Sequence, residues 1–183
     1  IWLWGPGTAP SMPKFKDNFG VSGTIISAVD LIKGIGKVIG LEPLDVPGAT
    51  GYYDTNYKGK GEYAINSLEK NDFVFVHIEA TDEAGHNGDT RAKVAALENF
   101  DKFIVGPIMG YLKKKNEPFK IMMLADHYTP VKVKTHTADP VFFAIYGEGV
   151  KGNNIAAFTE AAAAKTSITV TNAFELMNRF TKK

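Results

Sequence analysis

Apolar residues along the chain fall into short continuous runs, separated by longer stretches with helical spacing. The continuous runs are rich in β-branched and aromatic residues and therefore predict strands. They lie at residues 23–29, 73–78, 119–124 and 141–146, with a shorter run at 44–46. The run at 73–78 is almost unbroken, which is typical of a strand buried on both faces of a parallel sheet.

Between these runs, apolar residues recur every three or four positions, which predicts helices. This spacing covers residues 31–41, 62–69 and 90–115, and the segments after Asn154 and over 172–180. Gly106 and Pro107 should disturb the long helix, because proline lacks the N–H that helical hydrogen bonding requires. Strands that alternate with helices predict the α/β class, with a mostly parallel sheet flanked by helices.

Composition narrows the classes of partner and chemistry. The 183 residues, of which 44% are hydrophobic, suffice for one globular domain with a sizeable core. The net charge of +1 gives no sign of a nucleic-acid or membrane partner, and no apolar run approaches the roughly 18 residues of a membrane span. The absence of cysteine excludes disulfides, thiolate metal sites and cysteine nucleophiles, and it is compatible with a cytoplasmic location.

Aspartate and histidine residues gather next to the predicted strands. Asp82 and His86 follow the second long run and are four residues apart. Asp126 and His127 follow the third run directly, and His136 precedes the fourth. Because ligands of open α/β sheets bind beyond the carboxyl ends of the strands, we expect these side chains to share one site.

Carboxylate and imidazole groups at this spacing predict a metal site. These groups suit Mn, Zn, Fe or Mg, and residues four apart can point the same way from one helical turn. Asp126 and His127 are adjacent and point in divergent directions, so they can face two different ions. Five ligands are too many for one catalytic ion with open positions, and they suit two ions that share a cleft. A single histidine beside a strand is more often a hydrogen-bonded loop residue than a ligand, but three clusters together favour metal binding.

Other polar residues near these positions have two interpretations each. His77 lies within a predicted strand, so we expect a packed or orienting role rather than a ligand. Glu79, Glu83 and Asp89 either orient the ligand imidazoles or are solvated loop carboxylates. Lys33 follows a strand and could bind an anionic substrate, and the alternative is a lysine on a helix surface.

Several motifs in combination resemble a known family. The order Asp-x-x-x-His in "DEAGH", Asp-His in "ADH" and His-Thr before a Pro-Val strand in "THTADPV" resembles the alkaline phosphatase superfamily. The segments "SAVDLIKGIG", "PGATGYYDTNY" and "HIEATDEAGHNGD" are similar to the cofactor-independent (2,3-bisphosphoglycerate-independent) phosphoglycerate mutases of the archaeal type. The resemblance runs from about Trp2 to Met177, and the motifs are specific together rather than singly.

The resemblance implies an alkaline-phosphatase-like core and a metal-dependent isomerase of glycolysis in the cytoplasm. Members of the family interconvert 3-phosphoglycerate and 2-phosphoglycerate through a phosphoserine intermediate, with two divalent ions that are commonly Mn and sometimes Zn or Mg. Asp82, His86 and His136 match the ligands of one ion. Asp126 and His127 match ligands of the second.

Part of the family pattern has no match in this chain. In the family, the nucleophilic serine and an aspartate ligand of the second ion precede an inserted domain that helps to hold the substrate. The serines of this chain lie in other contexts, and its first residue is Ile1 rather than methionine. We therefore expect the C-terminal part of a longer mutase. Residues 1–22 would be an irregular linker from the missing inserted domain, and residues 23–183 would be part of the metal-binding, phosphatase-like domain.

Three functions remain open from the sequence. The first is a phosphoglycerate mutase whose catalytic serine lies upstream, so that no catalytic residue belongs to this chain and the isolated chain is inactive. The second is a metal-dependent phosphatase or phosphotransferase, because that superfamily shares its metal ligands. The third is an inactive metal-binding fragment. The partners expected for the first are phosphoglycerate, the N-terminal segment and the inserted domain of the same protein.

Overall fold

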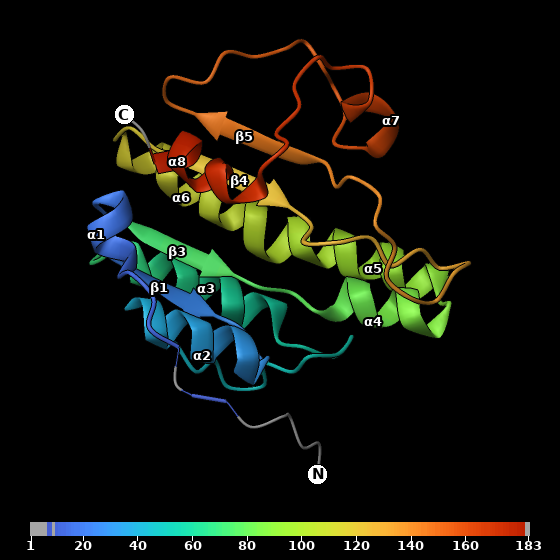
Figure 1. The fold of residues 1–183 in the computed structure, drawn as a ribbon, viewed down its shortest axis with the longest axis horizontal. Helices are drawn as coiled ribbons and strands as arrows, with labels where there is room; N and C mark the ends of the chain where they lie inside the picture. Colours follow the sequence, from blue (N-terminus) through green and yellow to red (C-terminus); the bar gives the residue numbers. More distant parts are fainter. Residues whose placement is uncertain (1–6, 9, 182–183) are drawn as a thin grey trace.

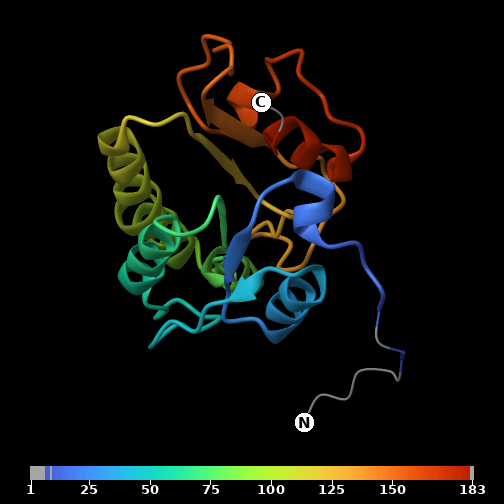
Figure 2. The same cartoon turned by 90° about the vertical axis from the view of Figure 1, so that its left-hand side faces the viewer.

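The structure, a computed structural model, describes residues 7–8 and 10–181 of an α/β fold (Figures 1 and 2). The strands are β1 (Gly23–Ile26), β2 (Glu42–Pro43), β3 (Phe73–Val76), β4 (Lys120–Leu124) and β5 (Phe143–Gly147). The helical elements are α1 (Phe15–Phe19), α2 (Asp30–Ile39), α3 (Tyr57–Ser67), α4 (Ala80–Asn87), α5 (Thr90–Phe100), the π-helical η1 (Asp101–Val105), α6 (Gly106–Lys115), α7 (Glu160–Ala163), the 3-10 helix η2 (Ala173–Glu175) and α8 (Leu176–Thr181). The start of the predicted resemblance, at Trp2, and part of the predicted linker lie outside the described residues.

β1 is the centre of a parallel sheet with the strand order β2–β1–β3. It pairs with β3 from Gly23 opposite Phe73 to Ile26 opposite Val76. All four residues of β1 are buried, as expected for a strand with neighbours on both sides. The predicted α/β class, with a parallel sheet flanked by helices, is confirmed.

β4 and β5 form a separate antiparallel pair, in which Leu124 lies opposite Phe143. This pair departs from the parallel arrangement of the other strands. In Figure 1 it lies beyond β3, and β4 points in the same direction as β3. Within the described ranges, no backbone pairing joins β3 to β4. Each of these two strands therefore has a strand neighbour on one side only.

α3 begins at Tyr57, five residues before the predicted helix start at residue 62. The side chain of Asn56 caps it by accepting a hydrogen bond from the Gly59 N–H at 2.8 Å. Gly59 and Gly61 disfavour a helix in this first stretch, because glycine is a poor helix former. Gly61, however, permits close packing, because a Cβ at this position would overlap the carbonyl oxygen of Phe103.

The helix predicted over residues 90–115 is continuous, but it contains the π-helical segment η1 directly before Gly106 and Pro107. Pro107 has no N–H to donate to the Phe103 carbonyl, four residues earlier. The Gly106 N–H instead bonds to the Asp101 carbonyl, five residues earlier, which is the π-helical pattern. The predicted disturbance is confirmed, and it lies in the turn that precedes the proline.

The short strand predicted at residues 44–46 is wrong, because β2 lies two residues earlier. The Leu44 N–H still donates to the Ile25 carbonyl at 2.9 Å. The chain then turns, and the Val46 carbonyl accepts a hydrogen bond from the Ala49 N–H at 3.0 Å. Apolar character at 44–46 therefore reflects burial beside the sheet rather than strand pairing.

The core consists of three small clusters of buried side chains. One of them joins Phe15 of α1 to Ile25 and Leu41, so the segment predicted to be irregular over 1–22 contains a packed helix. The other two clusters contain Tyr57, Ala80, Ala96 and Ile104, and Ile26, Val46 and Ala64. Within the described part of the chain, every helix is too short or too polar to span a membrane.

Lys60 is a fully buried lysine on α3. Its Nζ donates a hydrogen bond to the His77 carbonyl at 3.2 Å, at the end of β3. Burial lowers the pKa of the Lys60 ammonium to about 8, and the charge of Glu79 opposes part of that effect. The lysine therefore ties α3 to the strand end that leads into α4.

Substitution of Gly36, on α2, should destabilise the fold. A Cβ at Gly36 would lie 2.6 Å from Cγ2 of the buried Ile25, whereas a Cβ at Gly34 on the same helix would meet nothing within 4 Å. We expect Gly36→Ala to lower the free energy of unfolding by about 1–3 kcal/mol, and Gly34→Ala to raise it by about 0.5–1 kcal/mol. Urea unfolding measures both, and equal effects of the two substitutions would contradict the packing of α2 on β1.

Lys60→Met should remove a pH dependence of stability. The pKa of Lys60 is about 8 in the folded chain and has its ordinary value of 10.5 in the unfolded chain. Between these pH values only the unfolded chain holds the proton, so this residue makes the free energy of unfolding rise with pH, by about 3 kcal/mol over that range. Urea unfolding at several pH values should show this rise in the wild type and in Lys58→Met, an exposed control on the same helix. A rise of the same size in Lys60→Met would contradict it.

Candidate metal centre

The candidate ligands converge on α4, which follows β3 at the carboxyl end of the parallel sheet (Figure 1). Asp82 and His86 lie one turn apart on this helix. Gly85 lies between them, and a Cβ at this position would overlap the carbonyl oxygen of Thr129 in the loop after β4. The missing side chain therefore lets the loop that carries His127 approach Asp82 closely.

Three side chains form a close group. Nε2 of His86 lies 3.2 Å from Oδ2 of Asp82, and Nε2 of His136 lies 3.3 Å from Oδ1 of Asp82. The two Nε2 atoms lie 3.1 Å apart. Ligands at about 2.0–2.2 Å from a tetrahedral ion are about 3.3–3.6 Å from one another, so this spacing fits one bound ion. The structure thus brings together the three residues predicted to share an ion.

The hydrogen bonds of His86 decide which of its nitrogens can bind a cation. Its Nδ1 lies 3.1 Å from the carbonyl oxygen of Lys134. A carbonyl can only accept, so Nδ1 carries the proton of the neutral ring and Nε2 keeps a lone pair. Lys134 has a left-handed φ of 59°, at the end of a turn that places His136 two residues later. The lone pair of His86 and the carboxylate of Asp82 face each other, an arrangement that a divalent cation stabilises.

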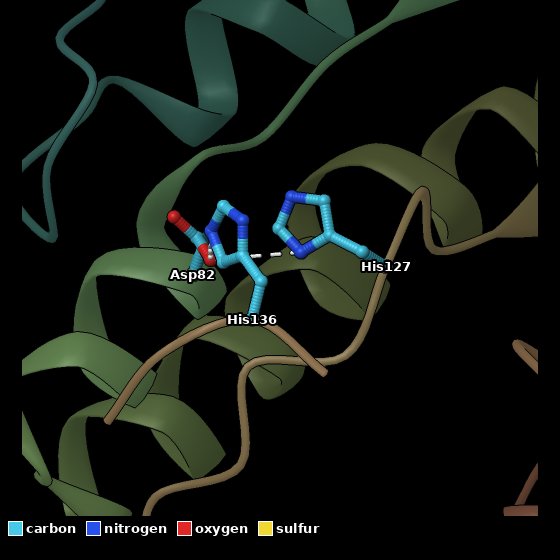
Figure 3. Close-up of side chains that lie close together, drawn as sticks. All are labelled: Asp82, His127 and His136. Carbon is cyan, nitrogen blue, oxygen red and sulfur yellow. Dashed lines mark ion pairs between the residues drawn. The ribbon is translucent and has the colours of Figure 1, made fainter. Parts of the chain in front are cut away.

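His127 joins the group from the loop after β4. Figure 3 shows its imidazole and that of His136 beside the carboxylate of Asp82. The two ring centroids lie 3.8 Å apart, and Nδ1 of His127 lies 4.0 Å from Oδ1 of Asp82. Nε2 of His127 lies 3.3 Å from Oδ2 of Asp126. The two predicted ligand sets are therefore contiguous, and their division between two ions stays a prediction.

Acidic side chains extend the site on the other side of Asp82. Carboxylate oxygens of Glu79, Asp82 and Glu83 lie within 4.8 Å of one another. Burial raises the pKa of Glu79, and the charge of Asp82 raises it further. Of the carboxylates whose role the sequence left open, Glu79 and Glu83 thus lie beside the candidate ligands. Asp89 instead caps α5, by accepting a hydrogen bond from the Ala92 N–H at 2.9 Å.

His77 occupies a packed position at the end of β3. Its Nδ1 lies 3.1 Å from Oγ of Ser27, and its Nε2 lies 3.3 Å from Oε2 of Glu79. Burial lowers the pKa of His77, which favours the neutral ring. This environment fits the packed or orienting role predicted for His77.

Lys33, the candidate substrate-binding residue, forms an ion pair with Asp45. Its Nζ lies 2.8 Å from Oδ1 of Asp45, and this hydrogen bond raises the pKa of Lys33. The structure thus gives Lys33 a carboxylate partner and does not show it joined to the group around Asp82. Its role in substrate binding stays a prediction.

Thr129 and Lys93 belong to the site but were not identified from the sequence. Thr129 is buried, and its hydroxyl donates a hydrogen bond to Oδ1 of Asp82. Nζ of Lys93, on α5, donates to the Thr129 carbonyl at 2.7 Å, and burial lowers the pKa of Lys93. Threonine is not a typical metal ligand, and its approach to Asp82 depends on the loop path, so the sequence carried no signal for it.

Two related sequences have the same protein name. A 2,3-bisphosphoglycerate-independent phosphoglycerate mutase of Methanosarcina acetivorans is 48% identical over 100% of this chain and 46% of its own length. A mutase of the same name from Methanothrix thermoacetophila is 49% identical over 90% of this chain and 42% of its own length. The chain therefore spans less than half the length of these curated relatives.

Solved structures share the fold. The PH0037 protein of Pyrococcus horikoshii matches 84% of this chain and 46% of its own, with a TM-score of 0.77 and 34% identity. A cofactor-independent phosphoglycerate mutase of Thermoplasma acidophilum matches 93% of this chain and 39% of its own, with a TM-score of 0.68. At 24% identity, this second likeness shows the fold alone.

These matches confirm the resemblance to cofactor-independent phosphoglycerate mutases that the motifs predicted. The profile of a broader family, the Metalloenzyme superfamily, matches residues 1–180. Because that match covers nearly the whole chain and not only the residues around Asp82, the protein belongs to the Metalloenzyme superfamily.

Proposed function

We propose that the chain is the metal-binding catalytic part of a phosphoglycerate mutase, which interconverts 3-phosphoglycerate and 2-phosphoglycerate. The observation that carries this proposal is the group of Asp82, His86 and His136, whose ligand atoms converge at 3.1–3.3 Å. Asp126 and His127 would contribute to a second ion beside it. The names of the relatives and the superfamily support the choice of reaction.

The metal that we favour is Mn, as the resemblance to the family implies, with Zn and Mg as alternatives. Carboxylate and imidazole suit all three, and thiolates are absent. Bound divalent ions would lower the pKa of an attacking serine and neutralise the phosphoryl oxygens. In the proposed reaction, the phosphate passes from the substrate to that serine. It then returns to the other hydroxyl of the bound glycerate. The hydrogen bond from Nδ1 of His86 to the Lys134 carbonyl leaves Nε2 free to face the ion.

We place the nucleophilic serine outside this chain. Ser22 donates its hydroxyl proton to Asp72 at 2.8 Å, and Ser67 is paired with Thr24 at 2.6 Å. Ser27 is buried, at 3% exposure. These three hydroxyls are hydrogen-bonded or buried. Ser11 and Ser167 are exposed, but their sequence contexts differ from that of the family's nucleophile, so the serine would come from another part of the same polypeptide.

The large exposed surface of the chain supports the proposal that another part of the polypeptide packs against it. Its accessible area is 12,318 Å², whereas a folded monomer of 19.9 kDa has about 8,700 Å². Residues 130–175, all of them described, include no buried residue. Those residues contain β5, and β3 and β4 each have a strand neighbour on one side only. The N-terminal segment and the inserted domain would dock on this face. As a glycolytic enzyme, the whole protein would work in the cytoplasm.

Two other functions use the same ligands. A metal-dependent phosphatase or phosphotransferase would share them and differ in the access of water to the phosphoserine. An inactive metal-binding fragment would lack chemistry altogether. The relatives' shared name favours the mutase.

The ligand assignment predicts loss of metal binding in single variants. Asp82→Asn, His86→Ala and His136→Ala should each weaken Mn²⁺ or Zn²⁺ binding at least about 100-fold, because each removes one of three converging ligand atoms. Isothermal titration calorimetry measures the affinity. Asp54→Asn is the control, because Asp54 is an exposed carboxylate that accepts only from Thr50. Unchanged metal content in all three variants would show that the assignment is wrong.

The activity should depend on the rest of the polypeptide. The 183-residue chain alone should not convert 3-phosphoglycerate, whereas the longer protein that contains it should do so with Mn²⁺. Phosphorus NMR follows 3-phosphoglycerate, 2-phosphoglycerate and free phosphate in one sample. Release of phosphate without any 2-phosphoglycerate would replace the mutase by a phosphatase, and catalysis by the isolated chain would contradict the upstream serine.

A further inference from the structure

The hydroxyl of Thr129 lies between two candidate ligands that belong to different segments. Thr129 is only 4% exposed, and its Oγ donates a hydrogen bond to Oδ1 of Asp82 on α4. The same Oγ lies 3.3 Å from Nδ1 of His127, two residues earlier in the loop. The hydroxyl is therefore the shared neighbour of a carboxylate and an imidazole.

Counting protons fixes the direction of both contacts. A threonine hydroxyl has one proton, and an ionised carboxylate can only accept, so that proton lies on the bond to Asp82. Toward His127 the hydroxyl can then only accept. Nδ1 of His127 must therefore carry a proton, because the buried hydroxyl cannot turn away. Nε2 lies 3.3 Å from Oδ2 of Asp126, which is a competing acceptor, but the Asp126 side chain is 74% exposed and can turn away, so Nε2 can keep its lone pair.

Backbone contacts hold Thr129 in this place. Its carbonyl accepts from Nζ of Lys93 at 2.7 Å. The Thr129 backbone and side chain also lie where a side chain at Gly85 would be. α4 and α5 thus fix the threonine from two directions.

We propose that Thr129 is a positioning residue, whose hydroxyl orients the Asp82 carboxylate and holds His127 in the tautomer that presents Nε2 to a metal. Second-sphere partners of this kind fix the ring orientation of ligand imidazoles and contribute to metal affinity. The consequence for metal binding rests on the proposed function, whereas the tautomer of His127 does not.

Histidine ring ¹⁵N NMR tests the tautomer in the metal-free protein at about pH 8.5, well above the usual imidazole pKa. The wild type and Thr129→Ser should both show His127 protonated at Nδ1. Thr129→Val, which keeps the shape and removes the hydroxyl, should lose this preference. A wild-type His127 protonated at Nε2 would overturn the proposal, whether or not any variant folds.

Calorimetry with Mn²⁺ and Zn²⁺ tests the consequence. Thr129→Val should bind about 10–100-fold more weakly, and Thr129→Ser should remain within about threefold of the wild type. Thr166→Val is the matched control, because Thr166 is part-buried and donates to the Ala163 carbonyl away from the site. Equal affinities of folded Thr129→Val and wild type would overturn the proposal. No metal binding by the wild type would instead refute the proposed function, while the tautomer still decides the role of Thr129.

Discussion

The carboxylate of Asp82 is the point on which the arrangement of the site depends. Its two oxygens meet His86 on the same helix, His136 before β5, and Thr129 after β4. The carboxylate oxygens and the imidazole nitrogens face one another at 3.1–3.3 Å, an arrangement that a divalent cation would stabilise, so this one acidic group lies where three separate pieces of chain meet.

Close backbone approach makes that convergence possible. Because Gly85 has no side chain, the loop after β4 can pack against α4. In the same way, Gly61 lets the backbone at Phe103 pack against α3. Both glycines lie within helices, where glycine costs about 0.5–1 kcal/mol relative to alanine. This local cost is offset by packing that brings α3, α4 and the later loops together. The fully buried Lys60 adds a polar tie between α3 and the end of β3.

The sequence predicted the parts of the site that depend on local geometry. Asp82 and His86 are four residues apart, so a single helical turn sets their separation. His136 precedes β5, and it reaches the same edge of the structure because β5 runs antiparallel to β4. The mostly parallel sheet that the sequence predicted would not by itself place it there. Thr129 and Lys93 could not be predicted, because their roles depend on which loop packs against which helix. The start of α3 was missed because its first turns contain glycines. The strand at 44–46 was predicted wrongly because apolar residues there are buried beside the sheet without strand pairing.

The π-helical segment η1, which contains none of the candidate ligands, constrains the number of residues between α5 and α6. Successive residues of an α-helix are rotated by about 100°, so the extra residue in a π-helical turn rotates everything that follows by about that angle. α5 packs against α4 and α6 packs against α3, and Ile108 of α6 reaches the cluster around Tyr57. The segment η1 thus sets the rotation of α6 relative to α5 about their common helix axis. Its residues can be exchanged, but their number cannot, because a single deletion would turn α6 away from α3.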